Sequence, residues 1–226
     1  MVYGVKPLLI SEIKKSTFKK GVAEEKKPSY IITKYGEKVV KPLIVGTVVD
    51  KYSSENYMRL TVNDESDSIN LRIFNVSENV LNIEIGDTVM AWGKVRETSE
   101  RFIRVDFIKK IDENMEKYLK SKLLKRLKEK ESFLRQLLEY SEIMSYEEFK
   151  DFCKENFDFD EEQVKEVLKN KVSEEKILEI FKKLGKFTLI EISNILNLSE
   201  EVILEILEKY KKEGIIKEEN GYYEVL

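Results

Sequence analysis

Between positions 57 and 104 the sequence alternates apolar residues with aromatic and basic ones. Successive side chains of a strand point to opposite faces, so alternate positions share a face. If the apolar positions face a core, the opposite face collects rings and cations together. Rings can stack on nucleobases while guanidinium and ammonium groups bind phosphates, which is the chemistry of single-strand binding. The residues predicted for this face are Tyr57, Arg59, Arg72, Phe74, Trp92, Lys94, Arg96, Phe102 and Arg104.

Each of these rings also has a purely structural interpretation. Phe74 and Trp92 are candidates for burial under the N-terminal segment or the helical region that follows. Tyr57 and Phe102 lie at the ends of predicted strands, where they can pack on loops. The same alternation predicts that Phe107 points into the core, on the side opposite to Trp92.

Catalysis is poorly supported by the residue types present. The chain has no histidine and one cysteine, Cys153, so the usual general base and nucleophile pairs are missing. No glycine-rich phosphate loop is present, and a single cysteine forms neither a disulfide within the chain nor a cysteine-based zinc site. We therefore expect no enzyme activity, no cofactor and no metal site. The lone thiol and the absence of a long apolar run predict a cytoplasmic, nucleoid-associated protein.

The strands needed to position this face are predicted in residues 42–111. Alternating segments rich in Val, Ile, Tyr and Phe cover residues 43–52, 57–64, 68–74, 88–98 and 102–110. A short helix is expected in the connection at residues 75–85. Five strands with a helical connector after the third indicate an OB-fold barrel, whose exposed face often binds nucleic acid. Another five-stranded barrel, such as an SH3-like one, stays open because periodicity does not fix topology.

From residue 112 the apolar pattern becomes helical. Apolar residues recur mostly at four-residue steps in a long helix over 112–140. Such a stripe must be covered, either by helices of other subunits or by this chain's own barrel and later helices. The predicted subunit-assembly residues are Met115, Leu119, Leu123, Leu127 and Leu134. Residues 141–172 form a predicted helical linker with two short helices, for which Ser145 and Asp158 are N-cap candidates.

The last segment, residues 173–226, is predicted to be a winged helix. Helices are expected at 174–184, 189–196 and 200–212, followed by a hairpin around Asn220 and Gly221, with Ile192 and Ile195 in its core. The first turns of the third helix are acidic, which repels phosphates and favours protein docking. The predicted docking residues are Glu200, Glu201, Glu205 and Glu208. Lys209, Lys211, Lys212 and Lys217 keep a duplex-binding alternative open.

Charge is unevenly distributed along the chain. The overall net charge is −3, but residues 1–41 hold 10 Lys and Arg against 4 Asp and Glu, a net +6. Residues 174–226 hold 8 against 12, a net −4. Because phosphate binding is driven by basic residues, we expect nucleic-acid contacts in the N-terminal half, next to a basic N-terminal arm at 1–41.

A group of segments in the predicted barrel, residues 44–49, 57–64, 69–74, 86–87 and 92–96, carries a further signal, which extends to 7–13, to 114–127 and to the C-terminal segment. Together these segments resemble the middle subunit of replication protein A, particularly its archaeal form. The resemblance implies that Phe74 is a base-stacking residue, whereas Thr98 stands where the family places a second aromatic. It also implies a heterotrimer built through the long helix, repair or replication proteins bound by the winged helix, and no catalysis.

The sequence thus predicts an α+β multidomain protein with a five-stranded OB-fold barrel, a long connecting helix and helical region, and a C-terminal winged helix. The expected function is that of a single-stranded-DNA-binding and assembly subunit of a replication protein A-like complex in DNA replication, repair and recombination. The alternative is an adaptor of a telomere-capping-like or RNA–protein complex that acts mainly through protein contacts.

Overall fold

A computed structural model describes residues 4–22, 24, 27–74, 76–172, 174–196 and 198–226. Its internal contacts divide the chain into two compact units, residues 1–132 and 133–226. The long helix α3 (Glu113–Ile143) contributes to both units.

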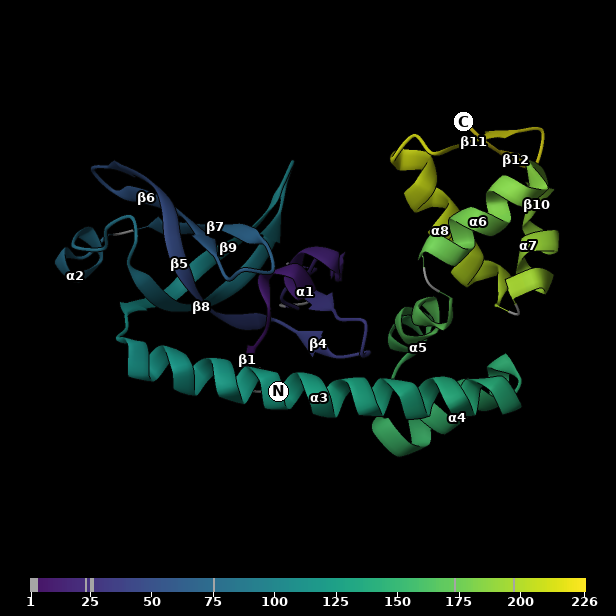
Figure 1. Cartoon of the computed structure of the whole chain (residues 1–226), viewed down its shortest axis with the longest axis horizontal. Helices are drawn as coiled ribbons and strands as arrows, with labels where there is room; N and C mark the ends of the chain where they lie inside the picture. The colour runs from purple at the N-terminus through teal and green to yellow at the C-terminus, as the bar shows by residue number, and fades with distance from the viewer. Residues whose placement is uncertain (1–3, 23, 25–26, 75, 173, 197) are drawn as a thin grey trace. The chain divides into compact units, whose positions relative to one another are not determined.

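The first unit is built on a closed barrel of five strands, which confirms the prediction for this segment. The strands pair in the order β5-β6-β7-β9-β8, and pairing of β8 with β5 closes the barrel (Figure 1). Both ends of each of the five strands lie within two residues of the limits predicted from alternation. The strands are β5 (Lys41–Ser54), β6 (Tyr57–Asn63), β7 (Ser68–Phe74), β8 (Thr88–Glu97) and β9 (Arg101–Lys110).

Strand β5 is long because it pairs with two other strands of the barrel, β8 and β6. Its first half pairs with β8, and from Thr47 onward it pairs with β6. At the crossover Gly46 lies so close to β6 that an added Cβ would meet the Asn63 carbonyl oxygen at 2.5 Å. The alternation of this strand is interrupted by a bulge between Val48 and Asp50.

Most of the inward positions predicted for the barrel strands fill its core. Met58, Leu60, Leu71, Val89 and Ile103 are all completely buried. The connection between β7 and β8 contains the expected short helix, α2 (Glu78–Leu81). Asn75, at the start of that connection, lies outside the described residues.

The N-terminal segment folds onto the barrel, whereas the sequence predicted only a basic arm. Strand β1 (Val5–Pro7) pairs in parallel with β5, and β2 (Thr17–Lys19), β3 (Tyr30–Ile32) and β4 (Lys38–Val39) form a small sheet of their own. Helix α1 (Ile10–Lys15) lies between β1 and β2 in the chain. At its first residue, the Asp64 carboxylate accepts a hydrogen bond from the Ile10 backbone amide at 2.7 Å. Strands of two or three residues are too short to show a period, so pattern analysis misses them.

The part of α3 within this unit packs on the folded N-terminal segment. Arg126 Nη1 lies 3.2 Å from Glu12, and its Nη2 donates to Glu37 at 2.7 Å. Leu119, Leu123 and Leu127 are half-buried. The stripe predicted for assembly is therefore partly used for packing within the chain.

In its described residues, the second unit contains the end of α3, five further α-helices, a 3₁₀ turn and a three-stranded sheet ordered β10-β12-β11. Ser145 caps α4 as predicted, but the cap of α5 is Asp160, and Asp158 instead ends α4 in a left-handed conformation. Ile192 is buried, whereas Ile195 is exposed, contrary to the expected core. The elements are α4 (Tyr146–Phe157), α5 (Glu161–Leu168), η1 (Lys169–Lys171), α6 (Glu174–Leu184), β10 (Lys186–Thr188), α7 (Leu189–Leu196), α8 (Glu200–Lys212), β11 (Ile216–Glu219) and β12 (Tyr222–Val225).

Candidate nucleic-acid interface

Four cations form a row across the outer face of the barrel. Arg59 of β6 is the register partner of Arg72 in β7, Arg72 is the partner of Arg104 in β9, and Arg104 is the partner of Lys94 in β8. We call these four residues the cation row. Because strands are ~4.8 Å apart, the row extends over about 14 Å. Arg96, also predicted for this face, is half-buried opposite Phe102.

An aromatic row runs beside the cation row. Tyr57 and Phe74 are register partners with ring centroids 5.4 Å apart. Trp92 and Phe107 are also partners, stacked at 4.1 Å with an interplanar angle of 14°. Phe74 is 51% exposed and Phe107 is 37% exposed. These four rings therefore offer stacking surfaces next to the cations.

The position of Phe107 corrects the sequence prediction, which placed this ring in the core. The pairing of β8 with β9 shifts between Trp92 and Gly93, so that Trp92 faces Phe107 while Gly93 faces Val105. Asp106 is thus an extra residue in β9, and every side chain after it changes face. Gly93 is needed at this point, because an added Cβ would lie 2.1 Å from the Arg104 carbonyl oxygen.

Phe102 also departs from the expected exposure. It lies on the outer face in register with Asn70 and Arg96, but only 8% of its surface is exposed. The Arg72 guanidinium carbon lies 3.8 Å above the centre of its ring and covers it. Phe102 therefore supports Arg72 and offers no open ring for stacking on a base.

Sequence analysis missed a further exposed ring, Tyr52, at the end of β5. Its centroid lies 6.4 Å from that of Tyr57, and the Arg59 guanidinium carbon lies 5.9 Å from its centre. Its position opposite Arg59 in the hairpin of β5 and β6 is the signal that could have placed it on this face. Irregular alternation in β5 concealed that signal.

Acidic residues neutralise part of the cation row. Arg59 pairs with Asp50 at 3.3 Å and Arg72 pairs with Glu100 at 3.0 Å. Arg104 and Lys94 form no ion pair with any residue that the structure describes. Like charges on neighbouring strands destabilise a sheet. The cation row therefore lowers the stability of the free protein, and an anionic ligand would restore that stability.

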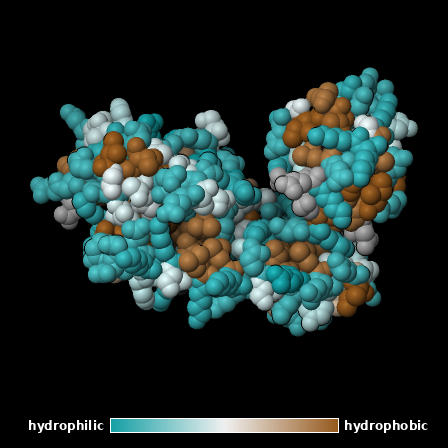
Figure 2. Space-filling model, viewed as in Figure 1, coloured by the Kyte–Doolittle hydropathy of each residue, from teal (hydrophilic) through white to brown (hydrophobic). Residues whose placement is uncertain are grey.

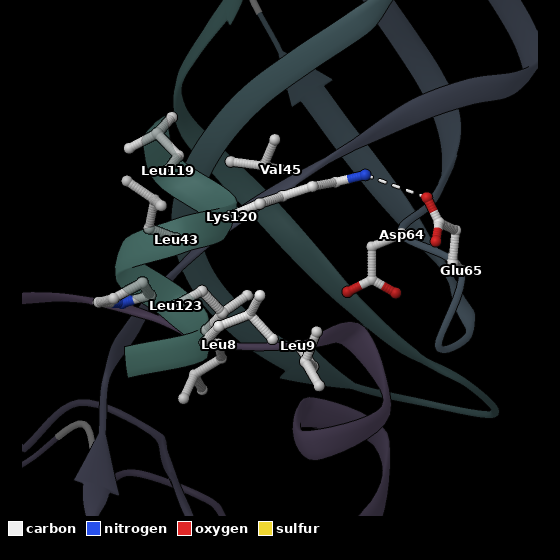
Figure 3. Close-up of a pocket in the computed structure, with 11 residues that line it drawn as sticks. Leu8, Leu9, Leu43, Val45, Asp64, Glu65, Leu119, Lys120 and Leu123 are labelled. Atoms are coloured by element: carbon white, nitrogen blue, oxygen red, sulfur yellow. Dashed lines mark hydrogen bonds and ion pairs between the residues drawn. The ribbon is translucent and has the colours of Figure 1, made fainter. Parts of the chain in front are cut away.

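A second feature of this unit is an apolar groove beside α3. Leu119, Leu123 and Leu124 of α3 face Leu43 and Val45 of β5 together with the segment 7–9 (Figure 3). One end is bridged by Lys120, which reaches across to Glu65 at 3.0 Å. Figure 2 shows hydrophobic surface over β1 and the adjacent turns of α3. We refer to these lining residues as the α3 groove.

The five residues predicted for subunit assembly lie in different surroundings in the structure. Met115 is exposed and Leu119, Leu123 and Leu127 are half-buried beside the barrel. Leu134 is 5% exposed and belongs to the core of the second unit. It is therefore not available to a partner, which corrects the prediction for that residue.

The acidic residues of α8 lie on its exposed side. Glu200, Glu201, Glu205 and Glu208 are all exposed, and Leu204 is an exposed apolar residue among them. Glu205 also pairs with Lys169 at 2.6 Å. The opposite side of α8 is buried in the second unit.

Features of catalytic or metal sites are sparse in the described part of the chain. No group of three or more potential metal ligands occurs among the described residues. Burial raises the pKa of the Cys153 thiol to about 12, so it is an unreactive, protonated group at neutral pH. Among the helices of the described residues, none combines the length and apolarity needed to cross a bilayer.

Comparison with known proteins identifies the barrel and one relative. A family model described as an OB-fold nucleic acid binding domain matches residues 43–111, which confirms the predicted OB-fold. The protein designated uncharacterized protein MJ1654 of Methanocaldococcus jannaschii is 32% identical over 193 residues. That alignment covers 84% of this chain and 77% of the relative.

Solved structures similar to this chain include two kinds of complex. The Stn1–Ten1 complex of S. pombe aligns with a TM-score of 0.47 at 19% identity, over 55% of this chain and 91% of that one. A replication protein A heterotrimer bound to ssDNA aligns with a TM-score of 0.47 at 16% identity, over 56% and 98%. Yeast RPA bound to ssDNA aligns with a TM-score of 0.43 at 23% identity, over 55% and 89%.

Proposed function

The chain belongs to the same family as MJ1654 of Methanocaldococcus jannaschii, and from this premise and its OB-fold nucleic acid binding domain we propose that it binds single-stranded DNA. In this proposal it is a non-enzymatic subunit of a replication protein A-like complex that acts in DNA replication, repair and recombination. The barrel binds the strand, the α3 groove joins other subunits, and the C-terminal unit docks further proteins.

The observation that carries the proposal is the pairing of the aromatic row with the cation row. Tyr57, Phe74, Phe107 and Trp92 can stack on bases while Arg59, Arg72, Arg104 and Lys94 bind the phosphates of the same strand. A duplex hides the faces of its bases in its own stack, so it can use the cations but not the rings. The arrangement therefore favours a single strand lying across β6, β7, β9 and β8.

Salt dependence tests this proposal directly. We expect labelled oligo-dT to bind with log K falling against log salt with a slope of about −2, because each phosphate neutralised contributes ~0.7 for a single strand and two to four cations take part. Duplex of the same length should bind at least about tenfold more weakly, since it forgoes stacking worth ~1–3 kcal/mol per base. Fluorescence anisotropy between low and moderate salt measures both. Equal affinity for the two ligands would exclude the proposal.

The adaptor alternative is favoured by a specific observation, the internal pairing of Arg59 with Asp50 and of Arg72 with Glu100. A face on which two of the four cations are already neutralised suits protein contacts. In that case the chain acts in a telomere-capping-like or RNA–protein complex. Absence of oligo-dT binding at low salt would favour this alternative.

For assembly, we propose that the α3 groove receives an apolar element of another subunit. Met115 and Tyr118 continue the groove's apolar surface along α3, and both are exposed. An unfilled apolar surface of this kind is typical of an interaction site. Leu124, 60% exposed at the groove's edge, is the residue most accessible to a partner.

For the C-terminal unit, we propose that α6, α7 and α8 with the sheet β10-β12-β11 form a winged helix that binds protein rather than DNA. The order of three helices with a hairpin supports this assignment, with Asn220 and Gly221 at the turn in positive φ. Acidic side chains on the exposed side of α8 repel phosphate and attract a basic partner helix. The basic end of α8, at Lys209, Lys211 and Lys212, is the site for the duplex-binding alternative.

Co-purification of the tagged full-length chain separates these two surfaces. We expect Leu124→Asp to lose other OB-fold subunits while keeping basic repair or replication factors, because a carboxylate in the α3 groove is unfavourable. The double variant Glu201→Lys with Glu208→Lys should lose the factors and keep the subunits. Mass spectrometry of the bound fraction measures both, and each variant is the other's control. Retention of all partners by both variants would contradict the two assignments.

A further inference from the structure

The tip of the β8–β9 hairpin carries an acidic side chain, Glu100, onto the outer face of β7. Its Oε1 accepts a hydrogen bond from Arg72 Nη2 at 3.0 Å, and both carboxylate oxygens lie 3.1 Å from the Asn70 amide nitrogen. The backbone of the turn is held by a hydrogen bond from Thr98 N to Glu100 O at 3.1 Å. A carboxylate therefore fills the polar corner between Asn70 and Arg72.

Arg72 is at the centre of the cation row. Its register partners are Arg59 on one side and Arg104 on the other, and its guanidinium carbon lies 3.8 Å from the centre of the Phe102 ring. Its buried Nε has no hydrogen-bond partner. Carboxylate and phosphate bind a guanidinium through the same kind of charge-assisted hydrogen bonds. Glu100 thus occupies a hydrogen-bonding position on Arg72 that a phosphate would otherwise use.

We infer that Glu100 competes with the phosphates of a bound single strand for Arg72 and thereby sets the affinity and the salt dependence of the interface. This inference rests on the proposed single-strand binding. In the free protein Glu100 neutralises the most crowded cation of the row. When a strand binds, the carboxylate either excludes a phosphate from Arg72 or is displaced by it.

The position of Glu100 suits displacement better than that of the other acidic residues on this face. It lies on a hairpin tip and its side chain is 48% exposed, so its ion pair contributes little to stability. Asp50 pairs with Arg59 at the end of the row, and its contact of 3.3 Å is longer. Glu100 alone among the described acidic residues holds two donors of β7 at once.

The test is the variant Glu100→Gln in the full-length chain, titrated with labelled oligo-dT by anisotropy. We expect Kd at low salt to fall about three- to fivefold, the scale of an exposed ion pair. The salt slope should become steeper by ~0.7, the contribution of one more phosphate on a single strand. The matched control is Glu65→Gln, which removes the same charge from the β6–β7 turn, away from the cation row, and should change Kd by less than about twofold.

A second background separates competition for Arg72 from a general charge effect. Arg72→Met keeps an apolar cover over Phe102, and in this background Glu100→Gln should have no more effect than Glu65→Gln. The inference is overturned if Glu100→Gln still tightens oligo-dT binding in the Arg72→Met background, or if Glu100→Gln binds no more tightly than Glu65→Gln. In either case, oligo-dT binding by the wild type leaves the proposed function standing. Failure of both wild type and Glu100→Gln to bind oligo-dT overturns the two together. Binding by Glu100→Gln alone supports both.

Discussion

The double variant Phe74→Ala with Trp92→Ala should lose at least about 30-fold in affinity for oligo-dT. Stacking contributes ~1–3 kcal/mol per base, and the two rings lie at different places along the aromatic row, so their losses should add. Each single variant should lose about 1 kcal/mol or more. Fluorescence anisotropy with a labelled oligonucleotide measures the change independently of Trp92, the chain's one tryptophan.

The matched control for this experiment is Tyr118→Ala. Tyr118 lies on α3 in the same unit and is 54% exposed, close to the 51% of Phe74, but it is outside the outer face of the barrel. It should bind oligo-dT as wild type does. If both single variants at Phe74 and Trp92 also bind within twofold of wild type, the aromatic row is not the binding surface. Thermal melting checks that each variant remains folded.

Alternation was enough to predict the barrel and most of its outer face. The phases of β6 and β7 were correct because neither strand contains an extra residue and the two pair with each other over their whole length without a bulge, so Met58, Leu60 and Leu71 point inward as their period requires. In β9 the same reasoning failed after Asp106. A bulge inserts one residue and reverses the face of those that follow, and no composition signal in the sequence marks it.

The assignment of these residues to nucleic-acid binding remains a prediction. The structure refines it by showing which of the rings are exposed. The nine predicted residues do lie on one face, but Phe102 is covered by Arg72, whereas Tyr52 and Phe107 add open rings. Exposure of this kind depends on which long side chain lies over which ring. A residue-by-residue period cannot supply that information.

The N-terminal segment shows a different limit of sequence analysis. Its net charge of +6 suggested a basic arm, yet Ile10, Ile13 and Ile31 are completely buried. The segment is held to α3 by a partly buried ion cluster in which Glu37 contacts both Lys6 and Arg126. Long-range pairs of this kind, such as Glu37 with Arg126, have no local signature.

That cluster leads to an expected acid sensitivity of the first unit. Burial raises the pKa of Glu37, but hydrogen bonds from Lys6 and Arg126 outweigh burial and lower the pKa to about 2. A carboxyl whose pKa is lower in the folded than in the unfolded chain stabilises the fold above its unfolded value, ~4.3. That stability is lost as the pH falls through the folded value, and a difference of about two pKa units corresponds to about 3 kcal/mol.

We therefore expect Glu37→Gln to be about 3 kcal/mol less stable than wild type at pH 7, with the difference shrinking below pH 4 and vanishing near pH 2. Urea unfolding followed by Trp92 fluorescence reports the first unit selectively, because Trp92 is the chain's one tryptophan and lies in β8. Glu65→Gln, which alters a highly exposed carboxyl, should run parallel to wild type at every pH. A Glu37→Gln curve that also runs parallel to wild type down to pH 2.5 would show that the ion cluster contributes nothing to the pH dependence. Convergence of the Glu37→Gln and wild-type curves on the acid side would instead establish that the ionised Glu37 carboxylate, paired with Lys6 and Arg126, stabilises the packing of α3 on the N-terminal segment.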